Sequence, residues 1–230
     1  MGAERGILGV ARCVRRVRGG DCEGVLAMST STKDDLVGLA DAGAKFGTIY
    51  ADPPWSFRVY SGKGKSRSAE RHYDTMSLDD MKNPAILPVE RLAADDCALF
   101  MWAVMPQLPE AMELIQAWGF EYKTCAFTWV KTYPGRPLSL AVGMGYWTRS
   151  NAELCLLATR GKPKRLNKDV QQIIMSARGA HSAKPEIAAE RIERLVGGPY
   201  LEMFGRWERK GWTVWGNGIE ATMFDEGEQK

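Results

Sequence analysis

The chain has 230 residues, of which 45% are hydrophobic and 26% charged, a composition that suits one globular domain with a substantial core. A net charge of +3 is too small to imply a polyanionic partner, and no apolar run approaches the roughly 20 residues that cross a bilayer. The five cysteines and two histidines are widely scattered. They argue against a disulfide framework and a metal site, and favour a cytoplasmic protein with reduced thiols.

The first 27 residues are rich in arginine and glycine and lack the apolar core of a signal peptide. Met28 then opens "MSTSTKDDL", which is typical of a natural protein start. We expect residues 1–27 to be a flexible or misassigned leader, with a basic arm that touches nucleic acid as the alternative. Residues 28–225 are expected to form a single domain.

Six apolar runs rich in β-branched and aromatic residues predict strands. They are "FGTIYA" (46–51), "CALFMWAV" (97–104), "CAFTWVK" (125–131), "ELCLLAT" (153–159), "YLEMFG" (200–205) and "WTVWGN" (212–217). Helical patterns alternate with these runs, so the sequence predicts an α/β fold with helices on both faces of a sheet.

Two helices are predicted most clearly, and each has a terminating signal. The first repeats apolar residues on one face and is followed by a glycine suited to a helix end: Leu108, Ala111, Met112, Ile115 and Gly119. The second begins near a proline, repeats at helical spacing and stops at "GGP": Pro185, Ala188, Ile192, Leu195 and Val196.

The positive charge of the chain is local. Residues 58–73, "RVYSGKGKSRSAERHY", hold five basic residues against one acid, and residues 160–168, "RGKPKRLNK", hold five more basic residues. Glycine and serine between the charges predict a mobile loop in the first stretch. Arg58, Lys63 and Lys65 are candidate phosphate contacts, with a merely solvated lid as the alternative.

The stretch "YADPPW" combines an acid, two prolines and a tryptophan at the end of the first predicted strand. Open α/β sheets bind ligands beyond the carboxyl ends of their strands, where Asp52 would lie. Pro53 and Pro54 have no N–H to donate, so we expect their carbonyl groups to be available as acceptors, while Trp55 adds a flat apolar face. Together they suit an aromatic amine, although a simple strand-ending turn is the alternative.

The exocyclic amine of adenine is a poor nucleophile because its lone pair is delocalised into the ring. Two acceptors that hold its two N–H groups would favour a pyramidal nitrogen facing an electrophilic methyl group, a stabilisation specific to the transition state. This chemistry needs positioning of the donor but no metal. In duplex DNA the base would have to be flipped out, and stacking on Trp55 would offset part of the cost.

The sequence resembles the N6-adenine methyltransferases related to the catalytic subunit of the eukaryotic messenger-RNA adenosine methyltransferase. The resemblance spans 46–217 and rests on ordered blocks: "ADPPW" (51–55), "HYDTMSLDDM" (72–81), "CALFMWAV" (97–104), "AWGF" (117–120), "TWVKT" (128–132), "GYWTRSNAELCLLATRGKP" (145–163), "HSAKPE" (181–186), "LEMFGR" (201–206) and "WGN" (215–217).

The resemblance implies a Rossmann-like methyltransferase sheet with a circularly permuted motif order and S-adenosyl-L-methionine as the methyl donor. It places Asp52, Pro53, Pro54 and Trp55 at the target amine. It also implies cofactor contacts by Asp34, Asp52, Lys184, Glu202, Arg206 and Asn217. The target base would be contacted by Tyr73 and Glu153.

The chain departs from the family pattern in two places. Trp207, Glu208 and Arg209 stand where small or polar residues are usual, and the segment between Asp52 and Tyr73 is longer and more basic than in the messenger-RNA enzyme. DNA is therefore the expected acceptor. RNA methylation and a noncatalytic nucleic-acid-binding paralogue are the alternatives, and the protein is expected to be a monomer or homodimer.

Several prominent residues also have a structural interpretation. Trp102, Trp118 and Trp129 lie in apolar patterns that favour core packing over ligand stacking, and Cys155 suits a small buried residue. Glu202 alternates within a strand and would be a solvent-facing charge if it had no cofactor role. Arg206 would then form a surface salt bridge.

Overall fold

The computed structural model describes residues 29–30, 33–55, 75–143, 145, 147–179 and 183–216. Its strands are β1 (Ser29–Thr30), β2 (Phe46–Ala51), β3 (Ala93–Ala103), β4 (Glu121–Tyr133), β5 (Arg136–Leu140), β6 (Ala152–Arg160), β7 (Ile173–Ala177), β8 (Tyr200–Met203) and β9 (Trp212–Trp215). Its helices are α1 (Lys33–Asp41), α2 (Leu78–Lys82), α3 (Val89–Leu92), the 3₁₀ turn η3 (Met105–Gln107), α4 (Leu108–Ala117) and α5 (Glu186–Leu195).

The described strands form one mixed sheet in the order β1-β9-β8-β2-β3-β6-β4-β5, with β7 paired to β4. Strands β1, β9, β8, β2 and β3 run parallel to one another, whereas β6 is antiparallel to both of its neighbours, β3 and β4. Since two antiparallel steps restore the direction, β4 runs the same way as β2 and β3. The end of β4 and the start of β6 therefore lie at the edge where β2, β3 and β8 finish.

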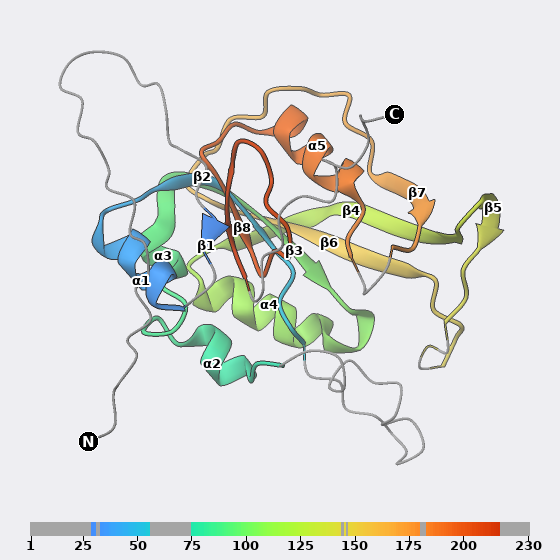
Figure 1. Ribbon diagram of the computed structural model, residues 1–230, viewed down its shortest axis with the longest axis horizontal. Helices are drawn as coiled ribbons and strands as arrows, with labels where there is room; N and C mark the ends of the chain where they lie inside the picture. Colours follow the sequence, from blue (N-terminus) through green and yellow to red (C-terminus); the bar gives the residue numbers. More distant parts are fainter. Residues whose placement is uncertain are drawn as a thin grey trace, which may run out of the picture.

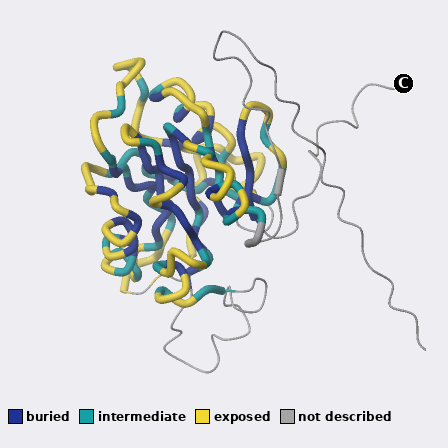
Figure 2. The backbone as a smooth tube through the Cα atoms, turned by 90° about the vertical axis from the view of Figure 1, so that its left-hand side faces the viewer, coloured by how far each residue is buried: buried dark blue, intermediate teal, exposed yellow. Residues whose placement is uncertain are grey.

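Helices cover both faces of the sheet (Figure 1), and each face has its own apolar cluster. One cluster contains buried residues of α1 to α4, and the other contains Ala188, Ala189 and Ile192 of α5. Figure 2 shows the buried backbone running through the middle of the molecule, with exposed segments outside. The predicted α/β fold with a mostly parallel sheet is confirmed.

All six predicted strands and both predicted helices are present. α4 buries Ala111, Leu114 and Ile115, and Gly119 follows it with φ of 78°, a conformation that glycine adopts without strain. β4 begins four residues earlier than the predicted run, at Glu121, where its side chains are exposed. The described part of the chain also contains elements that were not predicted: β1, β5, β7, α1, α2 and α3.

The structural interpretation of three tryptophans is confirmed, since Trp102, Trp118 and Trp129 are each at most 2% exposed. Cys155 is likewise buried, and the described cysteines are free thiols. Among the described helices, none combines the length and hydrophobicity that spanning a lipid bilayer requires.

Candidate active site

The DPPW turn leaves the sheet directly after β2. The backbone N–H of Asp52 donates to the carbonyl of Met203 at 3.3 Å, which ties the turn to the end of β8. The carbonyl of Pro53 accepts from Trp55 N–H at 2.8 Å, and that of Pro54 accepts from Met76 N–H at 3.3 Å. Each carbonyl oxygen has a second lone pair, so both can still accept one hydrogen bond from a ligand.

The Trp55 indole anchors this turn to the core. Its side chain is buried, with the residue only 6% exposed, and its Nε1–H donates to the carbonyl of Trp102 at 3.1 Å. The observed contact holds the turn against the end of β3. Stacking of a target base on Trp55 stays a prediction.

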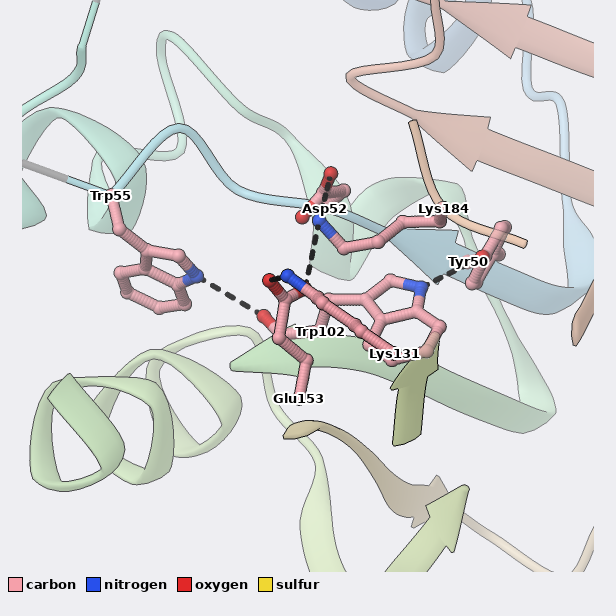
Figure 3. A network of polar contacts seen from close by, with 7 residues as sticks. All are labelled: Tyr50, Asp52, Trp55, Trp102, Lys131, Glu153 and Lys184. Atoms are coloured by element: carbon pink, nitrogen blue, oxygen red, sulfur yellow. Dashed lines mark hydrogen bonds and ion pairs between the residues drawn. The ribbon is translucent and has the colours of Figure 1, made fainter. Parts of the chain in front are cut away.

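Four side chains of alternating charge form a row at this edge of the sheet (Figure 3). Lys184 Nζ lies 2.7 Å from Asp52 Oδ2 and 3.4 Å from Glu153 Oε2, and Lys131 Nζ binds Glu153 Oε1. The Asp52 side chain keeps 31% of its surface exposed, and only its Oδ2 is given to Lys184. The carboxylate is therefore partly accessible, and the contact with Lys184 does not use its other oxygen, Oδ1.

The ammonium groups of the two lysines lie over aromatic rings. Lys184 Nζ lies 5.6 Å from the ring centre of Trp102, and Lys131 Nζ lies 4.8 Å from that of Trp129. The two indoles pack edge to face, and Trp102 Nε1–H donates to the hydroxyl of Tyr50 at 2.7 Å. Cation–π contacts and the packed rings hold the lysines at fixed positions, so the charge row is preorganised.

Burial and charge act in opposite directions on the two carboxyl groups. Burial raises the pKa of Asp52 above its ordinary value, although Lys184 counteracts part of the rise. For Glu153, burial also favours the neutral form, but Lys184 and Lys131 together outweigh it and lower the pKa. Burial alone would lower the pKa of Lys184, but the two carboxylates raise it. Lys184 is thus a stable cation that helps to keep Asp52 ionised.

A second group of residues lies beside this row, at the ends of β8 and β9. Glu202 Oε2 accepts from Arg209 Nε at 2.8 Å, and Arg209 also binds Glu186 at the start of α5. The Glu202 side chain is 15% exposed, so it is not the solvent-facing charge of the alternative interpretation. Burial, and then the charge of Asp52, raise the pKa of Glu202 to about 8, while the paired guanidinium favours the carboxylate.

The backbone around Glu202 is tightly constrained. Phe204 has φ of 65°, which is unusual for a non-glycine residue, and Gly205 N–H donates to the carbonyl of Trp215 at 3.0 Å. A Cβ on Gly216 would lie 2.0 Å from the Gly205 carbonyl oxygen, so the backbone segments at Gly205 and Gly216 approach too closely for a side chain at Gly216. This closely packed turn fixes the backbone beside the Glu202 carboxylate at the carboxyl end of β8.

The structure brings together the predicted residues Asp52, Pro53, Pro54, Glu153 and Lys184. The charge of Arg206 lowers the pKa of Asp52, and the charge of Asp52 raises the pKa of Glu202, so these two predicted residues are also near. Asp34 belongs to α1, but its side chain lies outside the described part of the chain. Five other candidates also lie outside the described residues: Arg58, Lys63, Lys65, Tyr73 and Asn217.

Sequence reasoning missed Lys131 and Arg209 as members of this site. Lys131 is the one charge at the end of the apolar run "CAFTWVK", which is a weak signal because strand ends commonly carry surface lysines. Arg209 was noted only as a departure from the family pattern. No cluster of potential metal ligands is found among the described His, Cys, Asp and Glu residues.

A mixed, mostly parallel α/β sheet with an acidic turn at the carboxyl end of a central strand is the arrangement of a Rossmann-like fold with a ligand site at that edge. Residues 46–218 match the MT-A70 family, and the chain belongs to that family. This confirms the resemblance to N6-adenine methyltransferases.

Individual relatives differ in how much of their length is matched. The chain is 35% identical over 192 residues to the Type II methyltransferase M.MunI of Mycoplasma sp, covering 75% of this chain and 77% of that protein. It is 29% identical over 181 residues to the human N(6)-adenosine-methyltransferase catalytic subunit METTL3, covering 77% of this chain but 29% of METTL3. The MT-A70-like protein of Drosophila melanogaster is 28% identical, with 27% of its length covered.

Proposed function

We propose that this protein transfers a methyl group from S-adenosyl-L-methionine to the N6 amine of adenine in DNA. The observation that carries the proposal is the Asp52 carboxylate, which follows β2 with Oδ2 bound to Lys184 and 31% of the side-chain surface exposed. Asp52 Oδ1 and the second lone pair of the Pro53 carbonyl would accept the two amine hydrogens. Holding both hydrogens directs the nitrogen lone pair towards the methyl donor.

The donor would be held by residues at the ends of β2, β8 and β9. Glu202 would offer a carboxylate oxygen to the ribose hydroxyls, and Lys184 and Arg206 would supply positive charge for the carboxylate of the methionine part. Asp34 and Asn217 remain proposed contacts from the family resemblance. When bound, the cofactor supplies a sulfonium methyl group, and the protein residues provide its orientation.

DNA is favoured as the acceptor by the extent of the similarity. The Mycoplasma methyltransferase is matched over most of both chains, whereas more than two thirds of METTL3 has no counterpart here. The basic residues Arg58, Lys63 and Lys65 would bind phosphates, and Tyr73 and Glu153 would contact the flipped base. RNA is the second candidate, because N(6)-adenosine-methyltransferases are matched over the same domain.

The assay compares duplex DNA, single-stranded DNA and RNA of one mixed sequence, each incubated with labelled S-adenosyl-L-methionine. Digestion to nucleosides and mass spectrometry are expected to find N6-methyladenine in the DNA. Label confined to RNA would move the assignment to the second candidate. Absence of donor binding by calorimetry would favour a noncatalytic paralogue.

Arg209 is expected to support donor binding through Glu202. In Arg209→Met, Glu202 loses its 2.8 Å guanidinium partner, so it protonates more readily and its orientation is less restricted. We expect the Kd for S-adenosyl-L-methionine to rise about tenfold while kcat at saturating donor changes little. Calorimetry gives the Kd. Arg209→Lys should recover part of the affinity, and unchanged affinity in Arg209→Met would contradict the role.

A further inference from the structure

The charge row of the candidate site continues outward along β4. Two residues beyond Lys131 lies Tyr133, roughly 7 Å further along the strand. Arg178, directly after β7, continues the pairing because its N–H donates to the Thr132 carbonyl at 3.2 Å. Its guanidinium carbon lies 5.5 Å from the ring centre of Tyr133. Lys184 on Trp102, Lys131 on Trp129 and Arg178 on Tyr133 thus repeat the same cation–aromatic pair.

Arg178 differs from the two lysines in its electrostatic surroundings. Asp52 and Glu153 neutralise Lys184 and Lys131, but Arg178 is exposed and forms no ion pair with a carboxylate in the described part of the chain. Residues 131–152 and 170–185 contain no aspartate or glutamate at all, although acids and bases are nearly balanced overall. Arg136 and Arg149 lie in the same acid-free region and are also exposed.

The same region exposes large apolar side chains. Trp147 is 97% exposed and Leu138 on β5 is 90% exposed, with Tyr133, Leu140 and Met175 partly exposed nearby in the sheet. Figure 1 shows β5 and the end of β7 projecting together from the far end of the sheet. Exposed aromatic rings in a region whose arginines form no carboxylate ion pair among the described residues are the combination that single-stranded nucleic acids bind, by base stacking and phosphate contact.

We propose that Arg178, supported by Tyr133, binds a phosphate of the strand that flanks the target nucleotide, and that Trp147 stacks on an unpaired base of that strand. This inference rests on the proposed function, because the path of the nucleic acid is traced outward from the adenine site at Asp52. The row of cations leads away from Asp52 towards Arg178. A nucleic-acid strand whose base enters the site would therefore pass over this acid-free region.

The experiment measures the affinity of the full-length protein for labelled duplex DNA, single-stranded DNA and RNA by fluorescence anisotropy across a salt series. Arg178→Ala is expected to weaken binding about tenfold and to reduce the slope of log K against log[salt] by about one. Arg178→Lys should keep the slope. Trp147→Ala should weaken binding to single strands with the slope unchanged.

Arg165→Ala is the matched control. Arg165 is exposed and pairs through its backbone with Val196, ahead of the start of β8, so it lies at the edge of the sheet opposite Asp52. The Arg165→Ala variant should bind nucleic acid with the affinity and salt slope of wild type.

The outcomes separate the two proposals. Wild-type protein that methylates DNA, with identical affinity and salt slope in Arg178→Ala, would overturn this inference and leave the function intact. A wild type that binds and methylates no nucleic acid would overturn the proposed function itself. If Trp147→Ala or Arg178→Ala alters the oligomeric state and leaves the nucleic-acid affinity unchanged, the region contacts a second copy of the chain and the inference is wrong.

Discussion

Asp52→Asn is expected to lower the rate of methyl transfer about 100-fold or more, while the affinity for S-adenosyl-L-methionine stays within a few-fold of wild type. The amide keeps the shape of the carboxyl group but replaces one acceptor oxygen with an N–H donor. Lys184 would orient the remaining oxygen towards itself, because it is a cation 2.7 Å away. The amine of the target base would then meet a donor.

The same substitution is expected to leave the melting temperature unchanged or slightly higher. Burial raises the pKa of Asp52, so the ionised form is less favourable in the folded chain than in the unfolded one. At neutral pH the charge therefore costs stability, and its removal relieves that cost. Loss of the Lys184 contact opposes the gain, although Lys184 still has Glu153 as a partner.

Single-turnover kinetics and thermal unfolding on the same preparations test both parts of this prediction. Asp79→Asn is a suitable control, because Asp79 is an acid of α2 whose side chain is 93% exposed. It should match wild type in rate. A rate for Asp52→Asn equal to that of wild type would remove Asp52 from the mechanism.

Lys184→Met is expected to move the acidic limb of the kcat/KM profile to higher pH. Lys184 lowers the pKa of Asp52 against the effect of burial, so its removal lets that pKa rise further. Under the proposed function, Asp52 accepts one amine hydrogen, and its ionised form is the effective acceptor. The variant should therefore lose activity at a pH where wild type is still active, and should regain part of it as the pH is raised.

The profile of Lys184→Arg separates this electrostatic effect from loss of a cofactor contact. Arginine keeps the positive charge, so the acidic limb of the Lys184→Arg profile should stay near that of wild type even if the rate falls at every pH. The measurement is kcat/KM at limiting DNA across pH 5 to 9. An acidic limb at the same pH in Lys184→Met and wild type would show that Lys184 does not set the ionisation of Asp52.

The central strands were predictable because their apolar runs reflect burial on both faces of the sheet. β2, β3, β6, β8 and β9 are such runs. β5 was missed because "RPLSL" has a proline and five exposed residues, and β7 because only Ile174 in "IIMSA" is fully buried. Both strands depend on pairing with β4, a long-range interaction that leaves no periodic pattern in the sequence.

The candidate site was predictable only in part. Asp52 stands out as an acid after an apolar run, but its partner Lys184 is 132 residues away and was assigned from the family resemblance. Lys131 was missed because a charged residue at a strand end looks like an ordinary surface residue. It belongs to the site because antiparallel β6 brings Glu153 next to β4, a consequence of topology that one sequence does not display.

The direction of β6 has a consequence for how this protein can diversify. The connection between Lys131 and Glu153 leaves the site edge and returns to it. On the other side of β3, Asp52 follows β2, Glu202 lies in β8 and Arg206 follows β8. Under the proposed function, part of the nucleic-acid contact would lie on this excursion, apart from the strands that carry the proposed donor contacts. Grafting a hairpin of different length between residues 134 and 151 is therefore expected to alter nucleic-acid binding more than donor binding.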